Sequence, residues 1–152
     1  MWWDELLHNQ ILLCALCAWG LAQLIKTVLY AILNHELDWG RLMGDGGMPS
    51  GHSATVTALA IRTGIETGFS SPMFAVTAVL AVIVMHDASG VRMEAGKHAK
   101  SLNMLWEELA ERMDLRLHRP EEALKEFVGH THLQVFCGAL LGAGLAVLMG
   151  ES

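Results

Sequence analysis

The sequence predicts an all-α integral membrane helical bundle of about four spanning helices, with amphipathic surface helices in the loop after the third span. Three observations support this prediction. The 152 residues are 53% hydrophobic with a mean hydropathy of +0.37, which is high for a soluble protein. Four apolar segments divide the chain, and the first is long enough to cross a bilayer. Polar residues interrupt them at helical spacing. The length suits one membrane-embedded domain over residues 1–152.

Residues 11–33 form the first predicted span. The N-terminus before it lacks a basic start and a small-residue cleavage site, so we expect this run to be retained. One face of the helix carries polar and aromatic side chains at helical spacing: Trp19, Gln23, Lys26 and Tyr30. Polar groups on one face of a span usually point into the bundle, so Lys26 is a candidate functional residue. The alternative is that its ammonium group reaches to the interface.

Residues 46–53, Gly-Gly-Met-Pro-Ser-Gly-His-Ser, predict a loop that leads into a helix N-terminus. The glycines and the proline exclude regular structure up to about Gly51, and an apolar run begins at Ala54. Free backbone N–H groups and the positive end of the helix dipole meet there and make an anion site beside His52. The alternative is a glycine-rich turn whose serines only cap the helix.

The second apolar helix is predicted over residues 53–69, with Arg62 and Glu66 expected to pair four residues apart. Ser71 can cap the third helix and Pro72 suits its first position. We expect this helix to end near Gly90, with Asp87 near the membrane edge.

A polar stretch, residues 90–103, leads to an amphipathic surface helix with apolar positions from Leu102 to Met113. Pro120 predicts a further helix start. Residues 133–149 form a short last span, with glycines suited to close packing.

Counting four spans places the loop after the first and the loop after the third on one side of the membrane. The polar residues gathered there are Lys26, Arg41, His52, Asp87, Arg92, His98 and His130. Seven of the ten Lys and Arg residues follow the third span: Arg92, Lys97, Lys100, Arg112, Arg116, Arg119 and Lys125. The positive-inside rule therefore predicts that this face is cytoplasmic and that both termini lie outside.

This gathering suits phosphate ester chemistry. Lys26, Arg41 and Arg92 could bind phosphate oxygens. Because His52 and His130 each start a span on the same side, one imidazole could attack phosphorus while the other protonates the departing alkoxide. Neutral imidazole is a nucleophile near pH 7, so this chemistry needs no metal and no other cofactor.

Other site types fit the sequence less well. A metal site could gather His86, Asp87, His98, His130 and His132, but no diagnostic ligand spacing appears. Cys14 and Cys17 have CxxC spacing without a second pair or a surrounding turn, so we predict neither a metal site nor a disulfide framework. The formal net charge of −6 argues against nucleic acid as a partner.

Three blocks of sequence resemble a known family: GGMPSGHSATVTALA, MHDASGVRMEAGKHAKSLN and VGHTHLQVFCGALLGAGLAVL. They are similar to the divergent branch of the type 2 phosphatidic acid phosphatase superfamily, also described as acid phosphatase/vanadium-dependent haloperoxidase-related. The resemblance covers about residues 23–149. It implies a helical bundle that hydrolyses phosphate esters, often of lipids, through a phosphohistidine.

The superfamily carries three signatures, KxxxxxxRP, PSGH and SRxxxxxHxxxD. The second matches fully, which implies that His52 is the acid/base and that Ser50 and Gly51 bind phosphate. Only Lys26 matches the first signature, because Leu33 stands at the arginine position and Arg41 lies too far along to align without a gap.

The third signature can be aligned in two ways. Arg92 and His98 have its spacing, but Leu102 then stands at the aspartate position. His130 has the better context, with Gln134 at the aspartate position. The resemblance therefore implies His130 as the nucleophile and Arg92 as a phosphate ligand from the preceding loop, with His98 as the alternative nucleophile. Gln134 is expected to orient the imidazole, and Asp87 could supply the missing charge.

The sequence thus predicts a metal-independent membrane phosphatase of a lipid or isoprenoid phosphate monoester or pyrophosphate, in a bacterial inner membrane with the site facing the cytoplasm. The expected partners are that substrate and membrane lipids, with a second copy of the chain as a further candidate. The alternative is a weakly active or inactive membrane protein that binds anionic lipid head groups or scaffolds a partner through the helix at 102–113. Haloperoxidase chemistry, with vanadate in the phosphate pocket, is a third possibility.

Overall fold

The computed structural model describes residues 1–36, 47–112, 124 and 129–150. All regular elements in this part of the chain are helices, which confirms the predicted fold class. They are α1 (Trp2–Leu7), α2 (Gln10–Asn34), α3 (Gly51–Thr67), α4 (Pro72–Ser89), α5 (Val91–Arg112) and α6 (His132–Gly150). Arg41 and the helix start predicted at Pro120 lie outside the described residues.

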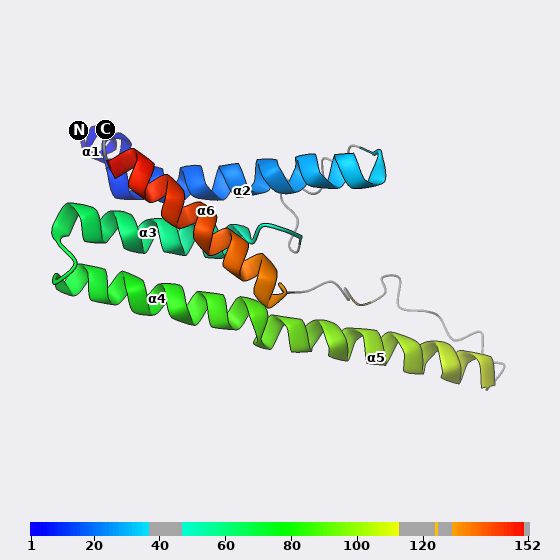
Figure 1. Ribbon diagram of the computed structural model, residues 1–152. Helices are drawn as coiled ribbons and strands as arrows, with labels where there is room; N and C mark the ends of the chain where they lie inside the picture. Colours follow the sequence, from blue (N-terminus) through cyan, green and yellow to red (C-terminus); the bar gives the residue numbers. More distant parts are fainter. Residues whose placement is uncertain (37–46, 113–123, 125–128, 151–152) are drawn as a thin grey trace.

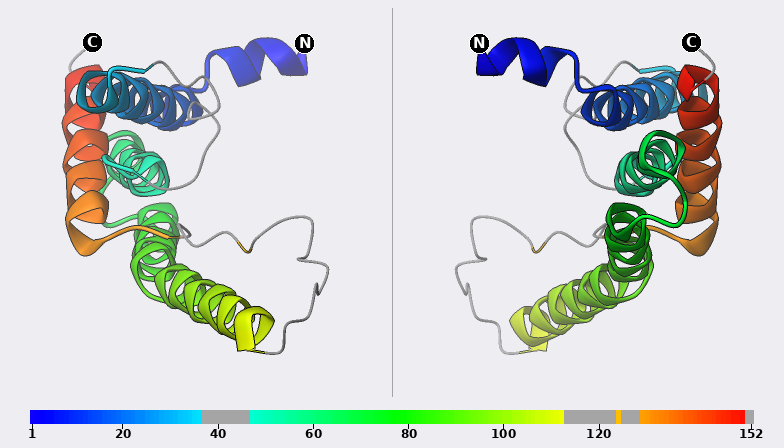
Figure 2. Two further views of the ribbon diagram at one scale, coloured as in Figure 1. Left: turned by 90° about the vertical axis from the view of Figure 1, so that its right-hand side faces the viewer. Right: turned by 90° about the vertical axis from the view of Figure 1, so that its left-hand side faces the viewer.

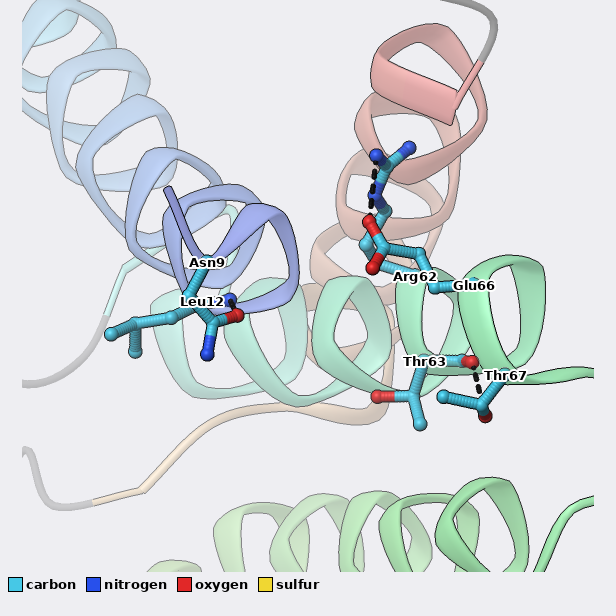
Figure 3. Close-up of polar contacts among 6 residues, drawn as sticks. All are labelled: Asn9, Leu12, Arg62, Thr63, Glu66 and Thr67. Atoms are coloured by element: carbon cyan, nitrogen blue, oxygen red, sulfur yellow. Dashed lines mark hydrogen bonds and ion pairs between the residues drawn. The ribbon is translucent and has the colours of Figure 1, made fainter. Parts of the chain in front are cut away.

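Side-chain caps fix where three of these helices begin. Asn9 accepts a hydrogen bond from the Leu12 backbone N–H at the start of α2, as Figure 3 shows. At the start of α3, the Ser50 side chain accepts a hydrogen bond from the Ser53 backbone N–H. This helix begins at Gly51, two residues earlier than predicted. Ser71 accepts from the Phe74 N–H with Pro72 in the first turn, as the sequence predicted. Each cap pairs a backbone donor that the helix itself leaves unpaired.

The long helices form a bundle with α3 at its centre. In Figure 1, α2, α3 and α4 run side by side and α6 crosses α3 obliquely. The end-on views of Figure 2 place α6 along one side of this stack, and α3 contacts α2, α4 and α6. The helices alternate in direction, so the start of α3, the end of α4 and the start of α6 gather at one end of the bundle, beside the middle of α2, whose last turns project beyond them (Figure 1). We call this the His52 end.

Small side chains build the core of the bundle. Its fully enclosed members are one cysteine and five alanines, from α2, α3 and α6: Cys14, Ala18, Ala22, Ala54, Ala58 and Ala146. Glycines bring α6 still closer to α3. A β-carbon at Gly142 would collide with the Ala54 carbonyl oxygen, and one at Gly138 with the Ser50 carbonyl oxygen. Such close backbone approach is typical of helices that associate in a membrane.

The outer surface is apolar, as expected for a protein surrounded by lipid. Large exposed side chains include Leu24 and Val28 on α2, Val79 and Ile83 on α4, and Leu140 on α6. Three helical segments are long and apolar enough to cross a membrane: Gln10–Asn34, the α4–α5 segment Pro72–Ala110, and His132–Gly150. The predicted spans at 11–33 and 133–149 agree with two of them to within one residue at each end.

The second predicted span, α3, has 17 residues and is not among these three segments. It carries Arg62 and Glu66, which lower its hydropathy. Because α3 lies between the other helices, fewer of its side chains are exposed than on α4. The expected Arg62–Glu66 ion pair is present, with Nη2 2.9 Å from Oε1, at the end of α3 remote from His52 (Figure 3).

The polar stretch after Gly90 differs from the expectation. The sequence predicts a connection over 90–103 before a helix from Leu102, whereas α5 already begins at Val91. Alanines, lysines and a glutamate in this stretch are good helix formers. The chain therefore interrupts its helical path at a single residue, Gly90, with φ −107° and ψ −86°. Arg92 consequently lies in the first turn of a helix and not in a loop.

Gly142→Ala tests the packing of α6 on α3. The added methyl group has to displace the Ala54 carbonyl, so we expect the free energy of unfolding in detergent micelles to fall by about 1–3 kcal/mol. Gly144→Ala is the matched control, because a β-carbon at Gly144 meets nothing within 4 Å. It should be neutral or stabilising, since alanine favours helix over glycine. Equal effects of the two substitutions would contradict the close contact.

Candidate active site

The start of α3 presents backbone donors at the His52 end. Ser50 is fully buried, and its Oγ accepts from the Ser53 N–H at 3.3 Å and from the Ser53 hydroxyl at 3.0 Å. The N–H groups of Gly51 and His52 donate to no backbone carbonyl of the described residues. Those two donors and the positive end of the α3 dipole have the chemistry to bind an anion. The serine cap and the predicted anion position thus coexist in one structure.

Lys26 of α2 runs beneath this loop. Its side chain is 5% exposed, so it is buried in the bundle as the helical spacing predicted. A β-carbon at Gly47 would lie 3.1 Å from Lys26 Cγ and 3.2 Å from Cδ, and Gly47 has φ +87°. The positive φ favours glycine at this position, and a β-carbon here would require the Lys26 side chain to shift by a few tenths of an ångström. Trp19 and Gln23 continue the same face of α2 to within 4 Å of a β-carbon at Gly51.

His130 is held at the junction of three helices. It is 4% exposed, and its N–H donates to the Ala88 carbonyl at the end of α4 (2.8 Å). Gly129 precedes it with φ +94°, and a β-carbon there would lie 2.5 Å from the Met93 nitrogen of α5. Only glycine permits this approach. Across the bundle, the Ser50 N–H donates to the Gln134 carbonyl of α6 (3.0 Å).

These contacts bring the two histidines of the predicted site together. The ring centroids of His52 and His130 are 6.1 Å apart, with an angle of 61° between the ring planes. His52 is half-buried and His130 is buried. The pair comes from two helix starts that are far apart in the sequence, as the span count predicted.

Gln134 has two structural functions at the start of α6. Its backbone N–H donates to Thr131 Oγ1 (3.3 Å), and its Oε1 accepts from the Thr131 N–H (3.1 Å). This reciprocal pair is a capping box, the Thr-x-x-Gln pattern at a helix start. The same Oε1 lies 3.2 Å from His130 Nδ1. The side chain therefore caps the helix and orients the imidazole at once.

The capping box also fixes the tautomer of His130. A backbone N–H can only donate, so the amide atom that faces Thr131 must be the oxygen. An oxygen can only accept from the imidazole, so Nδ1 of His130 carries a proton. In the neutral ring, the lone pair is then on Nε2.

Asp87 and Arg92 form an ion pair across the α4–α5 junction. Arg92 Nε lies 2.7 Å from Asp87 Oδ2. The Arg92 side chain is 42% exposed and the Asp87 side chain 39% exposed. The Arg92 carbonyl carbon would lie 2.8 Å from a β-carbon at Gly129, so this helix start borders the His130 loop. Asp87 thus has a contact with Arg92, and the orienting contact of His130 Nδ1 is to Gln134.

The remaining predicted residues lie elsewhere. His98 is exposed on α5, eight residues beyond Gly90 and thus about 12 Å along the helix. His86 and His132 are also exposed. No group of three His, Cys, Asp or Glu residues within the described ranges is placed to hold a metal ion.

Three features of the site were not found by sequence reasoning. The Thr-x-x-Gln pattern at 131–134 could have revealed the capping box. The glycine before His130 could have suggested a turn with positive φ. The position of Gln23 beside Gly51 had no sequence signal beyond the shared helix face.

Gln134→Ala tests the capping box. It removes the acceptor of the Thr131 N–H, so we expect the free energy of unfolding in micelles to fall by about 1 kcal/mol. Gln134→Glu keeps a capping-box oxygen and should retain most of the wild-type stability. If glutamate destabilises as much as alanine, the side chain does not stabilise the protein through this cap.

Comparison with known proteins places the chain in a family. The sequence matches the family described as Divergent PAP2 family over residues 7–145. It is 41% identical over 152 residues to the uncharacterized membrane protein YuiD of Bacillus subtilis (strain 168), covering 95% of this chain and 96% of that protein. No solved structure matches it. The helical bundle, the apolar outer surface and these matches agree with the resemblance of the three sequence blocks: the chain is a membrane protein that belongs to the divergent PAP2 family.

Proposed function

We propose that the protein is a membrane phosphatase that hydrolyses lipid or isoprenoid phosphate esters through a phosphohistidine on His130. The observation that supports this most is the paired arrangement of His52 and His130, with the His130 tautomer fixed by Gln134. A nucleophilic imidazole needs a lone pair on the attacking nitrogen and a second group that can protonate the leaving oxygen.

His130 is the proposed nucleophile. Its Nδ1–H donates to Gln134 Oε1, so Nε2 attacks phosphorus. The P–N bond forms as the P–O ester bond breaks, and the alkoxide takes a proton from His52. In the second step water attacks phosphorus, His52 accepts its proton, and the P–N bond breaks to release phosphate and restore both rings. Gln134 carries no charge, so it orients the ring without the added stabilisation that an aspartate would give to a cationic imidazole.

The phosphate group would be bound at the start of α3. Free N–H groups of Gly51 and His52 point along the helix axis, and the Ser50 hydroxyl hydrogen is available because its oxygen already accepts from Ser53. Lys26 and Arg92 supply positive charge at the same end of the bundle. These donors would stabilise the charge on the equatorial oxygens during transfer. Arg41, also proposed from the sequence, lies outside the described residues.

The location of the site fits a lipid substrate, and the Bacillus subtilis relative, a membrane protein, favours a bacterial membrane. The apolar outer surfaces of α2, α4 and α6 would let a lipid reach the His52 end by lateral diffusion. α5 begins beside this end, extends away from it (Figure 1), and carries the basic residues Arg92, Lys97, Lys100 and Arg112. By the positive-inside rule, their position favours a cytoplasmic site.

Substitution of the two histidines tests the proposal. In micelles containing a lipid phosphate, the purified protein should release phosphate without added divalent metal and should be inhibited by vanadate. His130→Ala or His52→Ala should lower kcat by about 100- to 10,000-fold, the usual contribution of such groups. His132→Ala is the matched control, because this exposed histidine lies two residues from His130 and should retain activity.

Two results would contradict the mechanism. Full activity of both histidine variants would exclude it. If His98→Ala loses activity while His130→Ala keeps it, the nucleophile is His98 on α5 and not His130. Head-group binding without turnover on a broad panel of lipid and isoprenoid phosphates would favour the non-catalytic alternative.

Arg92→Gln tests the phosphate ligand. Charge-assisted hydrogen bonds contribute about 1.5–3 kcal/mol, so kcat/KM should fall by about 10- to 100-fold. Lys97→Gln is the control, since it removes a charge from the same helix at a residue paired with Glu94 (2.6 Å). Equal losses for the two variants would indicate a general charge effect and not a specific contact.

A further inference from the structure

Gln23 of α2 has a polar atom that the described structure leaves without a partner. The side chain is only 8% exposed, and its Oε1 is buried and accepts no hydrogen bond from any described residue. A buried acceptor without a donor destabilises the folded protein. In native proteins such a group is usually paired with a ligand or an ordered water.

This amide lies at the edge of the proposed phosphate site. Its Cδ would be 3.9 Å from a β-carbon at Gly51, the residue directly before His52. On the next turn of α2, Lys26 packs against the glycine-rich loop. Gln23 and Lys26 thus face the same helix start, and neither side chain is accessible from the outer surface of the bundle.

The order of side chains along α2 matches the order of groups in a lipid phosphate. Lys26 is nearest the His52 end. Gln23 is three residues, or about 4.5 Å, further toward the bundle centre, and Trp19 is about 10 Å further than Lys26. In a lipid, the phosphate is at the membrane surface, the alcohol that bears it is deeper, and the hydrocarbon chain is deepest. With the phosphate bound between Lys26 and the start of α3, the alcohol would be the next group toward the bundle centre, beside Gln23 and Gly51.

We propose that Gln23 accepts a hydrogen bond from a free hydroxyl on the alcohol part of the substrate. The proposal rests on the proposed phosphatase function and narrows its substrate class. A fully ionised phosphate offers only acceptors, so it cannot satisfy the Gln23 oxygen. A glycerol-type phosphate monoester with an unesterified hydroxyl can. The site then prefers such a lipid to an isoprenoid phosphate, which has no hydroxyl at that position.

Two probes that differ in one hydroxyl test this proposal. The first is oleoyl lysophosphatidic acid, and the second is 3-oleoyloxypropyl phosphate, which has the same chain and phosphate without the free hydroxyl. For the wild-type protein, kcat/KM should be about tenfold or more higher for the hydroxylated probe, because the analogue leaves the buried acceptor unpaired. Gln23→Met keeps the side-chain volume without the amide oxygen and should bring the ratio close to one.

Gln10→Met is the matched control, since Gln10 is exposed at the other end of α2 and this variant should keep the wild-type ratio. Equal kcat/KM for both probes in the wild-type protein, or an unchanged ratio in Gln23→Met, would overturn the proposal. The wild-type comparison needs no variant and therefore stands even if Gln23→Met does not fold.

The binding of the same two probes separates this proposal from the phosphatase function. If neither probe is hydrolysed, the proposed phosphatase function fails for these substrates, and dissociation constants in micelles then test the contact alone. A tenfold tighter binding of lysophosphatidic acid by the wild-type protein would support the role of Gln23. Equal binding would overturn it.

Discussion

One backbone hydrogen bond links the two halves of the site. The Ser50 N–H, just before α3, donates to the Gln134 carbonyl in the first turn of α6. One turn further along α6, Gly138 lies against the Ser50 carbonyl, where a side chain would collide. This contact sets the register between the two helix starts. His52 follows Ser50 by two residues and His130 precedes Gln134 by four, so the register also sets the 6.1 Å separation of the rings.

The replacement of a carboxylate by Gln134 has two consequences. An aspartate could orient an imidazole and stabilise its cationic form, whereas an amide can only orient it. The same amide oxygen also completes a capping box with Thr131. The helix start and the histidine tautomer thus depend on the same side chain. In the proposed mechanism, His130 would therefore act as a nucleophile without electrostatic help from this side chain in the transition state.

Most of the fold was predictable from the sequence because membrane helices follow simple physical limits. The lengths of the apolar runs predicted the bounds of α2 and α6, and the Ser71-Pro72 pair predicted the start of α4. The gathering of polar groups at one end followed from alternating helix directions. The start of α5 was not predicted. The charged residues after Gly90 contrast with the apolar spans and were therefore interpreted as a loop, although their helix propensity is high.

The sequence named the two histidines that the structure brings together, but it did not predict most of the contacts around them. PSGH and the helix starts identified His52 and His130, but local pattern cannot reveal contacts between distant segments. The approach of Gly129 to Met93, the Ala88 carbonyl that holds His130 and the position of Gln23 beside Gly51 all depend on tertiary packing. The partner of Asp87 also depends on tertiary packing. The sequence suggested that it could pair with His130, whereas in the structure it pairs with Arg92.

Trapping the covalent intermediate tests the central claim most directly. The protein is mixed with a lipid phosphate substrate, quenched at alkaline pH because phosphohistidine is labile in acid, digested, and analysed by peptide mass spectrometry with fragmentation. The proposed mechanism predicts a phosphoryl group on His130. A phosphoryl group on His98 or His52, or steady turnover with no phosphorylated histidine at any quench time, would contradict it.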